Sequence, residues 1–397
     1  MYKNIVFFLI NILFLIPSSI IILNFKIGPI CSGAILLYYT YYAANKTKYF
    51  IKLSLFLLLF PLKNLLNLST TEYFFDLLYI SIQYLFLFSI FQSFLQKSIQ
   101  IDYKSIHKYY YNYLCLIVIV NALVYVGIIP QFGKGYSLEN YGFDTSGFTG
   151  VFDNYGASII FAFTAVNLLF YLVNNNFKKE INIVLIAITV LFIYKTYFRT
   201  GYACLLVGII FILVYSKINI KIKIKNIATI IICISLFTIY KFNNDPAFKY
   251  RITESNETTN ISDKEINSLG SGRVDFFEKG IEIFKESTLF AKIFGYGLPK
   301  TQELMGAKTG MKIFMHNEYM NSLIQNGIIG LGILLGINYY MLLFIIKYKK
   351  SVYYSLSLAN FAMLNTFFLL QGGPSPILYT FITFSLFLQL TDHTITK

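Results

Sequence analysis

The residues of this chain best suited to binding phosphate are its three arginines, Arg199, Arg251 and Arg273. Lysine and arginine together number 33, so lysine supplies nearly all of the positive charge. A guanidinium group donates two parallel hydrogen bonds to phosphate oxygens and stays charged at any physiological pH, which a lysine ammonium group does not match. We infer that the retained arginines bind phosphate, with Arg199 and Arg273 as the main candidates.

Each arginine also has a structural alternative. Arg199 lies in the segment YFRTG between two hydrophobic runs, where it is either a functional cation or the anchor of a short interfacial turn. For Arg273 the alternative is a solvated or lipid-headgroup contact. Arg251 lies in a polar segment rich in Asn, Ser and Thr, and we interpret it as a solvated residue.

His316 is a candidate proton acceptor. It opens the run HNEYMNSLIQNGIIGLG at 316–332, in which Gly327, Gly330 and Gly332 permit close helix contact inside a membrane. An imidazole with a near-neutral pKa accepts a proton from an attacking hydroxyl, or donates to a phosphate when it is charged. The alternative for a lone histidine is a structural role.

The elements that must position these residues are membrane-spanning helices. Of the 397 residues, 56% are hydrophobic and 13% charged, and the mean hydropathy is +0.61, which leaves too little polar surface for a soluble globule. The apolar runs reach the length of about 20 residues that a helix needs to cross a bilayer. They are apolar on all sides, as in LSLFLLLF at 53–60, which excludes the alternating strands of a β-barrel.

We therefore predict an all-α polytopic membrane protein with about twelve transmembrane helices. The predicted spans lie near residues 5–23, 27–44, 49–68, 73–95, 113–130, 155–173, 181–198, 201–216, 227–242, 319–346, 352–370 and 377–390. Three regions follow: spans one to nine within 1–242, an extracytoplasmic loop at 243–318, and spans ten to twelve with a short tail at 319–397.

The lysines predict the orientation of these spans. With the N-terminus in the cytoplasm, seventeen basic residues fall on inside segments and five on the short outside segments, as the positive-inside rule requires. Both termini are then cytoplasmic, and we expect the protein in a cytoplasmic (inner) membrane. The net charge of +14 is explained by this topology, so it does not indicate a nucleic-acid partner. His107 and His393 fall on the cytoplasmic side, whereas His316 and all three arginines fall on the outer side.

The long outer loop at 243–318 divides into two parts. Its first part, up to residue 272, is polar and is predicted to be irregular. From Gly272 to Glu286, Phe276, Phe277, Ile281 and Phe284 recur at helical spacing against charged residues. This pattern predicts an amphipathic helix that lies on the outer leaflet. The four cysteines lie singly in apolar runs, without the spacing of a metal site or a disulfide framework.

Four segments together resemble the O-antigen ligase and polymerase superfamily, which includes the Wzy-type polymerases. They are GFTGVFDN at 147–154, FRTG at 198–201, SGRVDFFEKGIEIFKESTLFAKIFGYG at 271–297, and HNEYMNSLIQNGIIGLG at 316–332. Two departures are visible. Family members often carry a basic residue just before the TG of the first segment, where this chain has Ser146-Gly147-Phe148. Ligases continue the last segment as GxxGxxG, whereas Gly332 here is one position early. The second departure favours polymerase over ligase.

The resemblance implies a glycosyltransferase that extends lipid-linked repeat units of O-antigen, capsule or exopolysaccharide. Its donor is a glycan on polyprenyl pyrophosphate, and its acceptor is a sugar hydroxyl. It implies Arg199, Arg273 and His316 as catalytic residues, with Asn317, Glu318 and Asn154 as further substrate contacts. No metal and no cofactor are implied. The expected partners are the lipid-linked glycan, membrane lipids, a chain-length regulator and a flippase.

Three alternatives remain open at this point. One is an O-antigen ligase that transfers the glycan to a lipid or protein acceptor. Another is a different lipid-linked glycosyltransferase. The third is a polysaccharide transporter or flippase, although such proteins usually show internal repeats and short loops on both sides.

Overall fold

A computed structural model describes most of the C-terminal three quarters of the chain. The described residues are 21–22, 25–26, 103–131, 147–152, 156–175, 179–216, 236, 239–253, 273–310, 315–372 and 376–395. The predicted spans 27–44, 49–68 and 73–95 lie outside these residues, as do most of the predicted spans 5–23 and 227–242. Ile21–Ile22 (β1) and Phe25–Lys26 (β2) pair as short antiparallel strands, so the prediction that the first helix continues to residue 23 is wrong.

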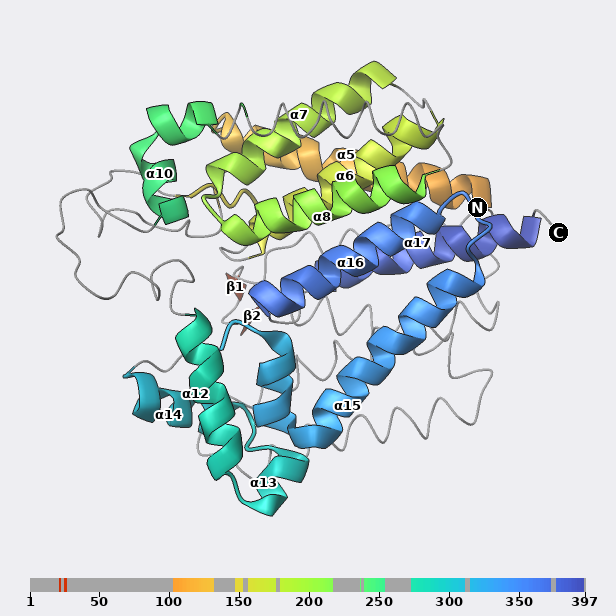
Figure 1. Cartoon of the computed structure of the whole chain (residues 1–397). Helices are drawn as coiled ribbons and strands as arrows, with labels where there is room; N and C mark the ends of the chain where they lie inside the picture. Colours follow the sequence, from red (N-terminus) through yellow and green to blue (C-terminus); the bar gives the residue numbers. More distant parts are fainter. Residues whose placement is uncertain are drawn as a thin grey trace.

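The described part is otherwise helical, and six of its helices run roughly parallel across the upper part of Figure 1. They are α5 (Tyr103–Tyr125), α6 (Ala157–Asn175), α7 (Lys179–Lys195), α8 (Arg199–Tyr215), α16 (Tyr354–Leu370) and α17 (Pro376–Ile395). Each overlaps a predicted span. Within the described residues, α6 and α15 (Glu318–Lys347) are long and apolar enough to cross a membrane, and α8 and α16 are shorter apolar helices.

Helix α8 lies against α6 and α16 at two glycines. A Cβ atom at Gly208 would lie 2.4 Å from Met363 Sδ and 2.6 Å from a Val166 methyl carbon. At Gly201 it would lie 2.7 Å from Ser158 Cβ. Because small residues let helix backbones approach closely inside a membrane, these contacts fix the start of α8 against its neighbours.

Helix α5 begins ten residues before the predicted span at 113–130, at Tyr103. Its first turns are held by buried tyrosines: the Tyr110 hydroxyl donates to Asn167 at 2.6 Å and the Tyr111 hydroxyl donates to Asn182 at 2.9 Å. Asn167 in turn donates to Asn360 of α16 at 2.9 Å. Tyrosine and asparagine lower the hydropathy of this segment although they are buried, and the hydropathy profile therefore missed its start.

Helix α15 is broken at Gly327, where the backbone has φ 70° and ψ −169°. Figure 1 shows a short first segment and a long second segment that runs off diagonally. The carbonyl groups released by the break accept hydrogen bonds from the segment between α13 and α14: Tyr296 N donates to Ile324 O at 2.9 Å and Gly297 N donates to Gln325 O at 2.8 Å. The single continuous span predicted at 319–346 is therefore two segments.

The second part of the segment predicted to be the long loop forms three helices, here called the loop unit: α12 (Arg273–Glu286), α13 (Leu289–Phe294) and α14 (Leu298–Thr309). The amphipathic helix predicted at 272–286 is confirmed as α12. Its apolar side packs on protein, because Phe276 and Ile283 are buried in a small core with methionines of α14 and α15. The expectation that this whole side rests on the outer leaflet is therefore wrong. The core residues are Phe276, Ile283, Met305, Met315, Met320 and Ile324.

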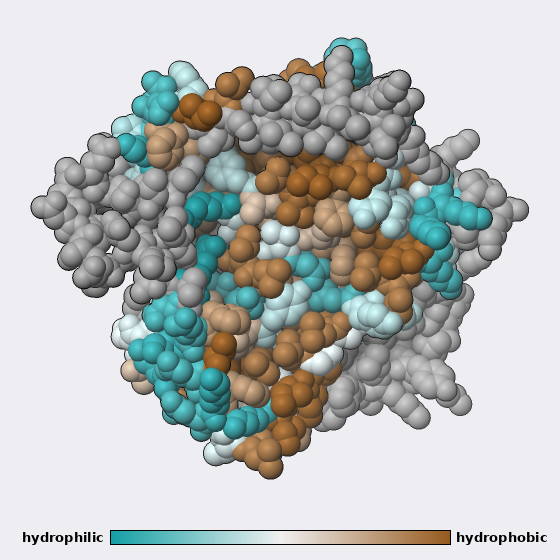
Figure 2. Space-filling view, in the orientation of Figure 1, coloured by the Kyte–Doolittle hydropathy of each residue, from teal (hydrophilic) through white to brown (hydrophobic). Residues whose placement is uncertain are grey.

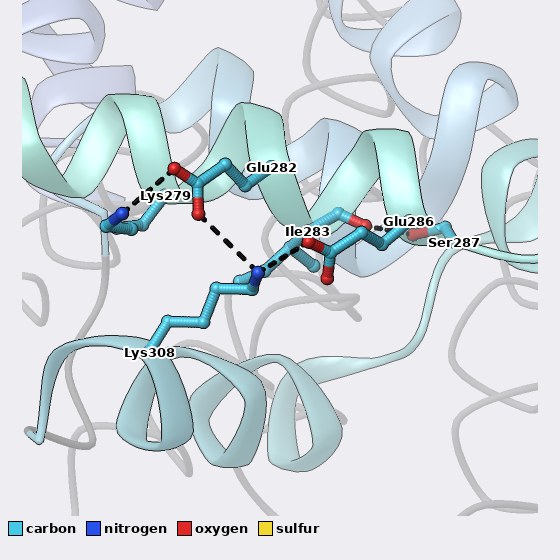
Figure 3. A network of polar contacts seen from close by, with 6 residues as sticks. All are labelled: Lys279, Glu282, Ile283, Glu286, Ser287 and Lys308. Carbon is cyan, nitrogen blue, oxygen red and sulfur yellow. Dashed lines mark hydrogen bonds and ion pairs between the residues drawn. The ribbon is translucent and has the colours of Figure 1, made fainter.

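Ion pairs join α12 to α14 on the opposite side of this loop unit (Figure 3). Lys308 lies 2.7 Å from Glu286 and 3.5 Å from Glu282, which also pairs with Lys279 at 2.9 Å. The pairing lowers the pKa of Glu282 and raises that of Lys308. These side chains are partly exposed to solvent, so each ion pair adds little to the stability of the loop unit.

A further helix, α10 (Pro246–Thr253), lies in the segment that was predicted to be irregular. Asp245 caps it, since the Phe248 backbone N donates to Asp245 Oδ1 at 3.0 Å, and Pro246 occupies its first position. Both are strong helix-start signals that the polar composition concealed. Helix α10 packs through Phe248 on Tyr194 and Tyr202, next to the turn that precedes α8.

Candidate functional site

The C-terminal end of α16 is the meeting point of three other elements. Gln371, which is 8% exposed, accepts two hydrogen bonds at its side-chain oxygen Oε1. One comes from Thr200 Oγ1 at 3.4 Å and the other from Arg273 Nη2 at 3.1 Å. The first turns of α8 and α12 are therefore held at the same amide group, although they are separated by more than seventy positions in the sequence.

His316 joins the same group of residues. Its ring lies 6.1 Å from that of Phe276, and the backbone of Gln371 is close enough to influence the pKa of the imidazole. Burial and the nearby Arg273 charge lower the pKa of His316, and the Gln371 backbone opposes them only in part. Because the pKa lies below the ordinary 6.5, the imidazole is mainly neutral at pH 7 and able to accept a proton.

Asn317 and Glu318 form the start of α15 beside the same end of α16. Asn317 caps α15 by accepting from Met320 N at 3.0 Å, and its amide donates to Leu369 O at 3.2 Å. A Cβ atom at Gly372 would lie 2.8 Å from Glu318 N, so only glycine allows this approach of the two backbones. Glu318 is buried at 7% exposure.

Arg199 is the first residue of α8 and is half-buried. The turn before it is fixed on both sides: Phe148 N donates to Lys195 O at 2.8 Å, and the Tyr194 hydroxyl hydrogen-bonds to Asp245. Tyr197 in this turn has a φ of 56°, and His316 has a φ of 50°. These are the two non-glycine residues with positive φ in the described part of the chain, and such costly backbone conformations cluster at functional sites.

The combined charges of these helix ends and arginines favour the binding of an anion at the end of α16. The N-terminal ends of α8, α12 and α15 meet at the last turn of α16, and each helix start carries partial positive charge. Arg199 and Arg273 add two full charges as the first residues of α8 and α12. Backbone N–H groups at helix starts together with guanidinium groups are the usual means of binding phosphate.

Five of the six residues predicted from the sequence thus lie on elements that meet here. Arg199 is next in sequence to Thr200, which hydrogen-bonds to Gln371. Arg273, His316 and Asn317 lie next to α16 or Gln371. The backbone of Glu318 lies against Gly372. Asn154 lies outside the described residues. Arg251 lies in the last turn of α10, and its side chain is likewise outside the described part.

Three residues of the site were missed by the sequence analysis: Thr200, Gln371 and Gly372. A signal for two of them was present, because the polar pair Gln371-Gly372 closes a long apolar run that ends at Leu370. Polar residues at the end of a membrane span often mark a functional site. Within the described residues, no group of three or more His, Cys, Asp and Glu side chains gathers as a metal site.

Comparison with known proteins gives one family. Residues 183–335 match the family model Wzy_C, which is described as O-Antigen ligase. The matched region runs from α7 into the long segment of α15 and includes Arg199, Arg273 and His316. No curated protein matches the chain.

Proposed function

Residues 183–335 carry the O-antigen ligase region of the ligase/polymerase superfamily, and from this premise we propose that the chain is a polymerase of lipid-linked oligosaccharide. It transfers a growing glycan from polyprenyl pyrophosphate to a hydroxyl of another lipid-linked repeat unit. The observation that supports this best is the meeting of Arg273, His316 and the first turn of α8, which begins with Arg199, around the end of α16. That arrangement combines an anion site with a neutral base.

The reaction divides between the arginines and the histidine. The bond between the anomeric carbon and the pyrophosphate oxygen breaks, and the acceptor hydroxyl oxygen bonds to the same carbon. The bond electrons leave with polyprenyl pyrophosphate, whose growing negative charge Arg199 and Arg273 stabilise. His316 accepts the proton of the acceptor hydroxyl, which its lowered pKa permits at neutral pH.

Asn317 and Glu318 have supporting roles in this proposal. Asn317 holds the start of α15 against α16, and Glu318 lies buried at the same junction. Both are placed to orient the acceptor or the pyrophosphate relative to His316. Asn154 completes the proposed substrate contacts from the segment that follows Phe152.

The protein is proposed to reside in the bacterial cytoplasmic membrane, with the site on the outer face and both termini in the cytoplasm. Its α6 and α15 are apolar and long enough to span the bilayer. The lysine distribution supports the orientation. A chain-length regulator and a flippase are the proposed protein partners, since one sets how many units are joined and the other delivers them.

A ligase is the second candidate, because the matched family model is described as O-Antigen ligase. Among the glycines of the 316–332 segment, Gly327 is required by backbone contact, whereas a Cβ atom at Gly332 would meet nothing within 4 Å. The third glycine therefore departs from the GxxGxxG spacing of ligases without making a close contact at its own position. For this reason we prefer a polymerase.

Single alanine substitutions of Arg199, Arg273 and His316 test the proposal, with exposed Lys300→Ala as the matched control. Membrane levels are compared by blot and surface polysaccharide by gel. A polymerase predicts single repeat units at the surface and no ladder in the three variants. Long chains that stay on the polyprenyl carrier would indicate a ligase, and repeat units trapped inside the cell would indicate a flippase. Full ladders from all three variants would refute the site.

A further inference from the structure

The short helix α13 carries large apolar side chains on the surface of the outer loop. Leu289 is 75% exposed and Phe290 is 64% exposed, and the rings of Phe290 and Phe294 lie 4.9 Å apart. This contrasts with α12, whose Phe276 and Ile283 are buried in the core of the loop unit. Adjacent exposed aromatic and leucine side chains of this kind mark an interaction surface.

The apolar surface of α13 continues onto the long segment of α15. A Cβ atom at Gly327 would lie 2.2 Å from Ile293 O and 2.6 Å from Phe294 N, so the two backbones touch at the break in α15. The next residue, Ile328, is 56% exposed. It begins a row of exposed apolar residues along α15 that also includes Leu335, Tyr339, Leu343 and Ile346.

We infer from this exposure that the row is the side of α15 that faces the bilayer. Only 33% of its apolar window is buried inside the protein, compared with 78% for α6. Figure 2 shows hydrophobic surface over the lower end of the loop unit and along α15, and hydrophilic surface over the flank formed by α12 and α14. Figure 1 places α13 toward the same end of the bundle as the C-terminal end of α16.

Lysines border the apolar surface of α13. Lys292 lies in its last turn and is partly exposed, and Lys285 at the end of α12 is exposed. Long lysine side chains extend their ammonium groups toward lipid phosphates while their stems rest on apolar surface. A short apolar helix with lysines at its edge therefore fits the boundary between acyl chains and headgroups.

We propose that α13 inserts Leu289 and Phe290 into the lipid leaflet in which the long segment of α15 begins. The insertion anchors the loop unit at the membrane surface and holds Arg273 and His316 at the level of lipid phosphate groups. Phospholipid is the molecule that we propose to cover the apolar side chains of α13, because their surface is continuous with the side of α15 inferred to face the bilayer. This inference does not depend on the reaction that the site catalyses.

A tryptophan reporter tests the insertion directly, since the chain contains no tryptophan. Full-length Phe290→Trp is reconstituted into vesicles of phosphatidylethanolamine and phosphatidylglycerol, with or without phosphatidylcholine brominated on its acyl chains. Glu303→Trp, on the exposed side of α14, is the matched control. Leu289→Trp is a second reporter on α13 in case the first variant does not fold.

The α13 reporters are expected to emit at shorter wavelength and to be quenched by brominated lipid at least about threefold more strongly than Glu303→Trp. Aqueous iodide should quench them less than the control. Iodide quenching equal to that of Glu303→Trp would overturn the proposal. Shielding from both quenchers would also overturn it, because a second copy or another protein would then cover α13. Neither readout requires glycosyl transfer, so the result is separate from the test of the proposed function.

Discussion

The helix bundle and the loop unit contribute different parts of the candidate site by different kinds of packing. In the bundle, α8 lies against α6 and α16 through glycines, and buried asparagines link α6 to α16. The loop unit has a small core with three methionines and an ion-pair network on its surface. The bundle supplies Arg199 and Gln371, whereas the loop unit supplies Arg273 and, at its junction with α15, His316.

This difference indicates how the site is assembled. Arg199 depends on close packing inside the membrane, so its position is as stable as the bundle. Arg273 and His316 lie on a unit that is joined to the break in α15 by backbone hydrogen bonds of the GYG segment at 295–297. Substitutions in the bundle should therefore reduce the amount of folded protein, and substitutions at the junction should reduce activity while the protein remains in the membrane.

The largest effect is expected for Gly208→Leu in the bundle. Its side chain would overlap Met363 and Val166, and overpacking a core typically costs about 1–3 kcal/mol. We expect a clear loss of membrane-inserted protein and a lower unfolding temperature in detergent. Gly336→Leu is the control, because a Cβ atom there meets nothing within 4 Å. Equal protein levels for the two variants would contradict the close packing of α8.

Gly327→Ala should separate activity from folding. Its φ of 70° is costly for alanine, by about 1–3 kcal/mol, and the new Cβ would clash with Ile293 O. We expect near-normal membrane levels and faster proteolysis of the loop unit. Polymer synthesis should fall at least about tenfold, which corresponds to an increase of about 1.4 kcal/mol in the activation free energy. Gly332→Ala provides the control, and a normal ladder from Gly327→Ala would argue against the junction.

Gln371→Ala tests the contact between the two regions. It removes the acceptor for Arg273 and Thr200, and hydrogen bonds to charged groups contribute about 1.5–3 kcal/mol. We expect a decrease in polymer synthesis of about tenfold in a vesicle assay, with unchanged protein level. Gln302→Ala on α14 is the control for loss of an amide. If both variants behave like wild type, Gln371 does not position Arg273.

The smallest expected effect is a shift in pH dependence. Burial and the Arg273 charge lower the pKa of His316, so Arg273→Ala should raise that pKa and move the acid limb of the rate profile to higher pH. Arg273→Lys keeps the charge and should leave the limb closer to that of wild type. Initial rates between about pH 5 and 8 measure both profiles. A limb that does not differ between the two variants would rule out electrostatic coupling of Arg273 to His316.

Much of this arrangement was accessible from the sequence. Arginine scarcity indicated Arg199 and Arg273, and helical spacing predicted α12 with Arg273 at its start. The break at Gly327 was not predicted, because glycine spacing in an apolar run indicates helix contact and does not reveal a distant backbone partner such as Ile293. Gln371 was missed for a similar reason: its importance arises from Thr200 and Arg273, which are far away in the sequence.

The most direct test of the account uses purified protein in vesicles that contain a polyprenyl-pyrophosphate-linked repeat unit. Glycan length and released polyprenyl pyrophosphate are measured for wild type, Arg273→Ala and the surface variant Lys300→Ala. The account predicts longer lipid-linked glycans with one polyprenyl pyrophosphate released per bond formed, at least about tenfold less of both for Arg273→Ala, and no change for Lys300→Ala. Equal yields from wild type and Arg273→Ala would contradict it.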